Sequence, residues 1–279
     1  MRIITIFIFG GLLAFTLQGC IKTTPKGNSG NPGGSDSLLV SSYQVTFTDS
    51  LLANTSSQYT VTYAYDKSNR IISSTQIGTS TNQGTVTDIN LAYQFTYGNG
   101  TETETGNNQI NNTPTNTSIV SNLNSSGFPT SAVSTTKAGA NTLITNTTTL
   151  YDLNNYCTEI DNTSTYNGAA APAADLKFTI SNGNVVEEDT YVSGSQIAAE
   201  TFTFGTNPNK TIMRFSTPPV TGTLNTDLVE SSLTTSLGIP TGALTYSYTF
   251  DSQGRVLTAT LTTSTGQTLL YYYNIQYVN

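Results

Sequence analysis

Histidine and tryptophan are both absent from the sequence. Without histidine, the chain lacks the side chain that most often acts as a general base near neutral pH and most often binds metal ions. Without tryptophan, it lacks the strongest platform for stacking on a sugar ring, although tyrosine can do the same. The aromatic content comes instead from 16 tyrosines and 11 phenylalanines.

Charged residues are also scarce, at 10% of the chain against a usual value of about 25%. The 17 acidic and 10 basic residues give a formal net charge of −7. A protein that binds nucleic acid generally carries a basic patch to neutralise phosphates, so we expect no nucleic-acid partner. Threonine, serine and asparagine replace the charges, and threonine is a good strand residue on either face of a sheet.

The N-terminal segment MRIITIFIFGGLLAFTLQGC has the layout of a secretory signal. A single basic residue, Arg2, precedes an apolar run that is too short for a stable membrane span. The segment ends in Leu-Gln-Gly-Cys, which resembles the bacterial lipobox, and the alternative is an ordinary signal with a chance cysteine. The resemblance implies that residues 1–19 are removed and that Cys20 carries acyl chains such as palmitate. The other cysteine, Cys157, then has no partner for an intramolecular disulfide.

Residues 20–37 contain Gly, Ser, Asn, Pro and Thr with no apolar periodicity, which predicts a flexible tether after the lipidated Cys20. Two or more acyl chains hold a protein on a membrane without a span. Residue 21 is isoleucine, so the aspartate-type inner-membrane retention signal is missing. We therefore expect an outer-membrane location, on either the periplasmic or the cell-surface face. Ser37 and Ser50 lie in Asp-Ser-apolar triplets that resemble bacterial O-glycosylation sites.

Residues 38–279 are long enough for one domain with its own core, and their periodicity is that of β-structure. In QYTVTYAYD (58–66), LAYQFTYG (91–98) and LTYSYTFD (244–251), aromatic and aliphatic residues alternate with polar ones. Strict alternation indicates strands with one buried and one wet face. About seven segments each contain two such runs around a short polar turn, which predicts an antiparallel meander of about seven hairpins. So large a sheet should curl into a barrel or half-barrel.

Two segments, YDKSNRI (65–71) and FDSQGRV (250–256), share an Asp-x-x-[Asn/Gly]-Arg pattern that turn chemistry explains. Asp66 and Asp251 are placed to accept hydrogen bonds from the backbone N–H groups two and three residues later. Asn69 and Gly254 occupy the position where a left-handed backbone is needed. Asp152 and Asn155 repeat the scheme without the arginine, and Asn182-Gly183 has the composition of a two-residue hairpin turn.

These turns resemble the YD hairpin repeats of RHS-type bacterial surface proteins. The combination of lipobox, tether, YD-type hairpins and a closing hairpin at 247–261 resembles a family of bacterial lipoproteins of unknown function with a porin-like fold. Only the copies at 62–75 and 247–261 match well. The resemblance implies a fold and supplies no activity.

Two structural alternatives remain open. A membrane-spanning barrel would need an apolar outer band, whereas the outer-face candidates here are Thr, Ser, Gln and Asn, which favours a sheet in water. The segment TDLVESSLTTSLGIP (226–240) has a capping-box pattern at Asp227 and Glu230 and predicts at most one short helix. A Ser/Thr-rich loop is the alternative for this segment.

Candidate chemistry is sparse, and we expect no metal and no cofactor. The acidic run Glu187-Glu188-Asp189 has oxygen ligands for calcium but reads better as solvated charge at a strand end. Glu102 and Glu104 share one strand face and could form a glycosidase pair, but two carboxylates on an edge strand more often prevent aggregation. Cys157 lies in an alternating run and should be a buried small residue.

The sequence therefore predicts an outer-membrane-anchored lipoprotein that acts as a binding or scaffolding module of the cell envelope. Candidate ligands are a glycan, a peptide or a lipid, and the membrane is contacted through the lipid on Cys20. The alternative is a carboxylate-based glycan hydrolase. We expect no catalysis, because most carboxylates fall in polar surroundings where their pKa stays ordinary.

Overall fold

The computed structural model describes residues 39–49, 55–82, 84–110, 113–208 and 225–278, and all its regular elements are strands. The strands are β1 Val40–Asp49, β2 Thr55–Tyr65, β3 Ile71–Asn82, β4 Thr85–Tyr97, β5 Thr101–Ile110, β6 Thr113–Leu123, β7 Pro129–Ala138, β8 Asn141–Tyr151, β9 Cys157–Tyr166, β10 Ala169–Ala171, β11 Ala174–Ser181, β12 Asn184–Val192, β13 Ser195–Pro208, β14 Asp227–Ser236, β15 Ile239–Phe250, β16 Val256–Thr263 and β17 Thr268–Tyr277.

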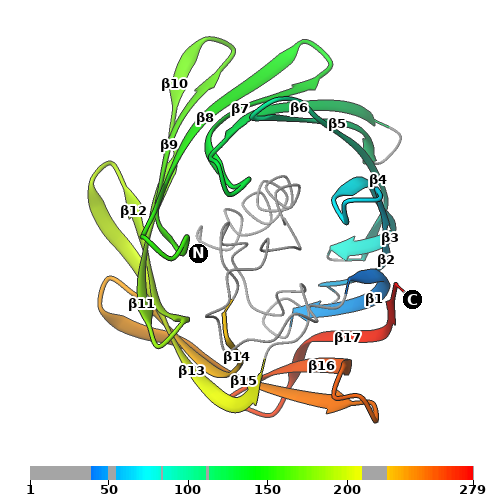
Figure 1. Cartoon of the computed structure of the whole chain (residues 1–279), viewed down its shortest axis with the longest axis vertical. Coiled ribbons are helices and arrows are strands. Elements are labelled where there is room, and N and C mark those ends of the chain that lie inside the picture. The colour runs from blue at the N-terminus through cyan, green and yellow to red at the C-terminus, as the bar shows by residue number, and fades with distance from the viewer. Residues whose placement is uncertain (1–38, 50–54, 83, 111–112, 209–224, 279) are drawn as a thin grey trace.

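Consecutive strands pair antiparallel, except that β10 and β11 both pair with β9, and the first and last strands pair with each other (Figure 1). The meander therefore closes into a barrel of 16 strands, and closure removes the free edges that an open sheet would expose. The short strand β10 extends the hairpin at one rim, and β11 takes over the pairing with β9 further along. The prediction of an all-β antiparallel meander is confirmed, although seven hairpins undercount the strands.

Strand register shows which side chains face into the barrel. Residues paired across strands lie on the same face, so Phe95, Glu104 and Ile119 form one row and all three are buried. The adjacent row of Gln94, Thr105 and Ser118 is exposed. Side chains crowd together on the concave side of a curved sheet, so the buried rows face inward and the exposed rows face outward. The predicted wet and buried faces of these strands are confirmed.

The apolar core lies on the inner face and is unevenly distributed around the barrel. Strands β1–β4 and β14–β17 contribute most of it, including Val45, Val61, Leu91 and Leu261. A smaller cluster around Cys157, Ile160, Phe178 and Val185 joins β9, β11 and β12. On β6–β9, hydroxyl and amide pairs replace apolar contacts, such as Thr145 with Ser164 and Thr147 with Asn162.

The Asp-x-x-[Asn/Gly]-Arg turns form one rim of the barrel and have the predicted turn conformation. Asp66 Oδ1 accepts hydrogen bonds from the backbone N–H groups of Ser68 at 2.8 Å and Arg70 at 3.0 Å. The carboxylate thus accepts from the backbone N–H groups two and four residues later, whereas the prediction was two and three residues later. Asn69 has φ 60° and Gly254 φ 74°, as the turn requires.

Two further turns on this rim have the same hydrogen-bond pattern. Asp152 accepts from the N–H groups of Asn154 and Tyr156, and Asn124 accepts from Ser126 and Phe128. The predicted Asn182-Gly183 hairpin is confirmed, since Ser181 and Asn184 pair on either side of it.

The segment predicted as a short helix or a Ser/Thr loop is strand β14 followed by β15, and both alternatives are wrong. Leu237 and Gly238, placed at the expected helix end, have φ values of 49° and 77° and form a two-residue hairpin turn. Leu228 and Val229 are buried, and pairing with β13 and β15 outweighs the capping pattern. In the described part of the chain, no helix is long and apolar enough to cross a membrane.

Candidate functional site

The two predicted carboxylates on β5 face the barrel interior. Glu102 and Glu104 are each 3% exposed, and Glu104 pairs across strands with Phe95 and Ile119. The expectation of an edge strand is wrong, because β5 pairs with β4 on one side and with β6 on the other. Burial, together with the negative charge of Glu102, raises the pKa of Glu104 to about 9.

A second acidic group lies on the inner face of β12 and β13. Glu188 and Glu200 are direct cross-strand partners, and Ser232 on β14 donates a hydrogen bond to Glu200. Burial, followed by the charges of Glu200 and Asp189, raises the pKa of Glu188 to about 8. The run at 187–189 is therefore in the middle of a strand, and only its central residue faces inward, which corrects the prediction of a solvated strand end.

Both acidic groups are exceptions to the expectation that most carboxylates keep an ordinary pKa. Reading the sequence alone could not reveal this, because Thr/Ser/Asn-rich surroundings looked wet. The alternation of Glu102 and Glu104 with threonines placed both carboxylates on one strand face, but it did not show that this face is buried.

The outer face of the described barrel is mostly polar. Rows of Thr, Ser, Gln and Asn run around it, including Gln58, Gln94, Asn116, Asn146 and Thr260. A salt bridge also lies on this face, between Lys177 and Glu159 at 2.9 Å. Exposed apolar side chains also lie there, such as Ile77 and the cross-strand pair of Val120 and Val133. This surface lacks the continuous apolar band that a lipid-facing barrel needs.

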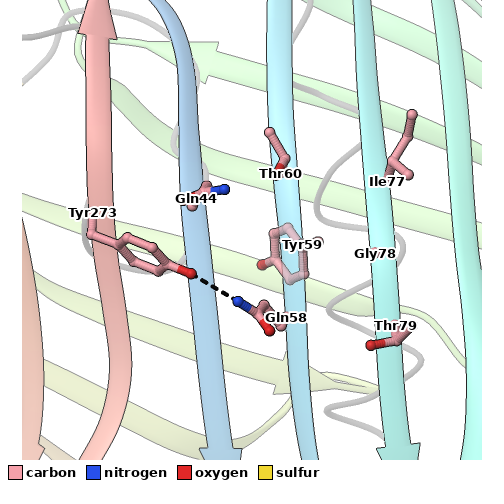
Figure 2. Close-up of a pocket in the computed structure, with 8 residues that line it drawn as sticks. All are labelled: Gln44, Gln58, Tyr59, Thr60, Ile77, Gly78, Thr79 and Tyr273. Carbon is pink, nitrogen blue, oxygen red and sulfur yellow. Dashed lines mark hydrogen bonds between the residues drawn. The ribbon is translucent and has the colours of Figure 1, made fainter.

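A hollow on this outer wall spans β17, β1, β2 and β3 (Figure 2). Six of its lining residues are outward-facing and meet as cross-strand neighbours: Tyr273, Gln44, Gln58, Thr60, Ile77 and Thr79. Tyr59 and Gly78 complete the lining. None of these eight side chains carries a charge, so the hollow offers amides, hydroxyls and the ring of Tyr273, the one lining tyrosine that faces outward.

Hydrogen bonds position the polar groups of the hollow. The side-chain amide of Gln58 on β2 donates a hydrogen bond to the hydroxyl of Tyr273 on β17 at 2.9 Å, across the intervening strand β1 (Figure 2). Asn274, at a bulge of β17 with φ 51°, donates its amide to Gln44. Tyr271 stacks on Tyr273 with ring centroids 5.1 Å apart and ring planes 10° apart. The result is a flat aromatic pair beside a row of fixed amides.

Gly78 sets the close spacing of β2 and β3 beneath the hollow. A Cβ atom at this position would lie 2.0 Å from the carbonyl oxygen of Gln58 and 2.5 Å from the Cα atom of Tyr59. Both neighbours are backbone atoms, so only glycine permits this approach. No pattern within the sequence predicted this hollow, because its lining residues come from both β1–β3 and β17, at opposite ends of the described chain.

The remaining predicted sites have separate outcomes. Cys20, the signal and tether up to residue 37, Ser37 and Ser50 lie outside the described residues. Cys157 is fully buried, as predicted, and forms no disulfide within the described residues. Among the residues that the structure describes, no group of three or more His, Cys, Asp and Glu side chains is arranged to hold a metal.

The fold is similar to that of two solved porin-like proteins. One, from Bacteroides uniformis, is 16% identical with a TM-score of 0.58, covering 88% of this chain and 99% of its own. Another, from Bacteroides vulgatus, is 12% identical with a TM-score of 0.56, covering 86% and 99%. No family model matches the chain, and no curated protein matches it. The comparison confirms the porin-like fold, whereas the lipoprotein family and the YD-type repeats remain a resemblance.

Proposed function

We propose that this chain is a lipid-anchored envelope protein of the bacterial outer membrane whose barrel stands in water and binds a neutral glycan on its outer wall. The lipid on Cys20 supplies the membrane attachment. The polar outer face supports a barrel in water, since Gln, Asn and paired ions would be costly against lipid. The likeness to porin-like proteins is consistent with an envelope location.

The observation that carries the glycan proposal is the stacked pair of Tyr271 and Tyr273 beside the uncharged hollow. A sugar presents an apolar ring face and a rim of hydroxyl groups. The tyrosine ring can stack on the apolar face of the sugar. The amides of Gln44, Gln58 and Asn274 can bind its hydroxyl groups, because an amide both donates and accepts hydrogen bonds. A charged ligand would find no counter-ion among the lining residues.

The test is a screen of the full chain, purified in detergent, against an array of neutral and acidic oligosaccharides. We expect binding to neutral members and a several-fold loss of affinity in Tyr273→Ala and Gln58→Ala. Tyr191→Ala is the matched control. Tyr191 on β12 is also an outer-wall tyrosine, and it packs under Lys177 of β11. Absence of binding to every neutral glycan, or equal binding by Tyr273→Ala and wild type, would contradict the proposal.

A glycan hydrolase is the second candidate, and the inward pair of Glu102 and Glu104 is the observation that favours it. A carboxyl group whose pKa is raised to about 9 stays protonated at neutral pH, as a general acid must. We propose binding without catalysis, since the outer-wall hollow does not include this pair. Turnover of a glycoside substrate that disappears in Glu104→Gln while the circular dichroism spectrum persists would reverse this choice.

A further inference from the structure

Four consecutive strands place a stripe of acidic and hydroxyl groups on the inner face, on a different surface from the outer hollow. The inner stripe consists of Glu188 on β12, Glu200 on β13, Ser232 on β14 and Tyr246 on β15. Glu188 lies directly opposite Glu200. Ser232 donates a hydrogen bond to Glu200, and its hydroxyl lies 3.5 Å from that of Tyr246. The stripe thus brings carboxylate and hydroxyl oxygens from four strands together.

One oxygen of the inner stripe has no partner. Glu188 is 9% exposed, and its Oε2 atom makes no hydrogen bond in the structure. A buried polar atom without a partner costs stability, and two carboxylates directly opposite each other on a sheet repel each other whenever both are ionised. An arrangement with both costs is explained if the stripe receives a hydrogen-bond donor that carries positive charge.

The described part of the chain offers no such donor on the inner face. Lys67, Arg70 and Arg255 lie in the turns of one rim. Lys177 is on the outer face, where it pairs with Glu159, and Lys137 pairs with the outward-facing Asn116. The positive charge that would complete the inner stripe must therefore come from a group other than these residues.

The donor set favours an ammonium group over a metal ion. A calcium ion takes six to eight oxygen ligands, usually with several carboxylates. The described residues include no metal-holding group of three acidic, His or Cys side chains. An ammonium group has three N–H donors and no acceptor, so three oxygens satisfy it. Glu188 Oε2, the Glu200 carboxylate and one hydroxyl of the stripe supply that number.

We propose that the inner stripe binds the protonated primary amine of a ligand that enters the barrel. The two carboxylates neutralise the ammonium group, and Ser232 and Tyr246 orient it from the neighbouring strands. This site goes beyond the proposed glycan function and does not depend on it, since the two sites share no residue and lie on opposite faces of the wall.

The charges around Glu188 predict a pH signature for this binding. Burial and the nearby charges of Glu200 and Asp189 raise its pKa to about 8, while Phe178 on β11 faces it without a charge. At pH 7 the free site therefore holds a proton that the amine must displace. Affinity should rise between pH 6 and pH 9 and fall as the amine loses its own proton near a pKa of about 10.4.

The test is isothermal titration calorimetry of the full chain with 1,5-diaminopentane, with 1,5-pentanediol as the uncharged analogue and calcium chloride as the metal probe. We expect binding of the diamine alone, proton release into the buffer at pH 7, and a loss of affinity of about tenfold or more in Glu188→Gln. Glu187→Gln should bind as wild type, because Glu187 pairs with Thr179 and Thr201 on the outer face.

Three results would overturn the proposal: no diamine binding at pH 8, equal affinity in Glu188→Gln and wild type, or binding of calcium without the diamine. If Glu188→Gln does not fold, Ser232→Ala gives the same reading. That variant keeps both carboxylates and removes a hydroxyl of the stripe, so it should weaken diamine binding, and unchanged affinity there would also overturn the proposal.

Discussion

Arg255 lies over the ring of Tyr277, with its guanidinium carbon 5.0 Å from the ring centroid, and Tyr277 donates its hydroxyl to the carbonyl of Val256 at 2.7 Å. The turn between β15 and β16, which contains Arg255, is thereby linked to the end of β17. Arg70 and Tyr97 repeat the arrangement at 4.3 Å, and Tyr97 donates to the carbonyl of Ile71 at 2.8 Å.

The same tyrosine contact recurs around this rim. In each case a tyrosine at or near the end of one strand donates its hydroxyl to a carbonyl at or near the start of the preceding strand. The five pairs are Tyr65 with Val40, Tyr97 with Ile71, Tyr151 with Pro129, Tyr248 with Val229 and Tyr277 with Val256. These tyrosines therefore join neighbouring strands at the rim, and in two of the five cases, Tyr65 and Tyr151, the aspartate of a rim turn follows directly.

Removing one rim hydroxyl should destabilise the barrel. Tyr97→Phe leaves the carbonyl of Ile71 without its donor, and we expect a loss of about 0.5–1.5 kcal/mol in the free energy of unfolding. The measurement is denaturant unfolding followed by circular dichroism. Tyr166→Phe is the control, because Tyr166 is 48% exposed and should tolerate the change. An equal midpoint for Tyr97→Phe and wild type would show that the contact contributes nothing.

The left-handed backbone at Gly254 predicts a strong preference for glycine there. Gly254→Val forces a β-branched residue to φ 74°, and we expect a cost of about 1–3 kcal/mol in thermal or chemical unfolding. Gly242→Val in β15 is the matched control, since nothing lies within 4 Å of a Cβ there and valine favours strands. Similar stabilities of the two variants would argue against a strained turn.

Gly78 should tolerate substitution even less than Gly254 does. In Gly78→Ala, the added methyl group meets two backbone atoms of β2, so the strands must separate, at a cost of about 1–3 kcal/mol or more. Because the same strands line the hollow, hydrogen exchange of the β2–β3 amides should increase in the variant. Unchanged protection of these amides would indicate that the wall adapts without opening.

Glu104 makes stability depend on pH. Its folded pKa of about 9 lies above the unfolded value of about 4.3, so between these limits the folded state holds a proton that the unfolded chain has lost. The contribution of Glu104 to stability is therefore full below pH 4 and is lost as pH rises toward 9, by at most about 1.4 kcal/mol per pH unit. Glu104→Gln should reduce this slope in melting experiments from pH 5 to pH 9, and the slope that remains is expected from Glu188, whose pKa is also raised.

The outward Glu159 provides the control for that experiment. Glu159→Gln removes a carboxylate of the surface ion pair with Lys177 and should leave the decline with pH unchanged. A wild-type melting temperature that is constant from pH 5 to pH 9 would show that Glu104 ionises freely in the folded barrel.

The lipid attachment is tested in cells. Cys20→Ser removes the thiol that would receive the lipid, so the variant should stay unprocessed or leave the membrane fraction. Fractionation and mass spectrometry of the N-terminus distinguish these outcomes from wild type. A Cys20→Ser protein that is processed and membrane-bound like wild type would exclude lipid attachment at this residue.

The sequence by itself determined the β-strands, their buried faces and the rim turns. Strand periodicity and turn chemistry are local properties, so alternation around Tyr93 and the carboxylate of Asp66 could be interpreted without knowing the fold. Local patterns also misled, since the capping-box pattern at Asp227 is equally compatible with a strand once β13 and β15 pair with it.

Only the tertiary structure decided what closure of the sheet does to individual side chains. When β1 meets β17, the sheet has no edge, and carboxylates such as Glu104 and Glu188 become buried on the concave face. Closure also brings Tyr273 beside Gln58, 215 residues apart in the chain, and forms the outer hollow. These contacts depend on pairing between distant strands, and a burial that arises from curvature has no signature within a single strand.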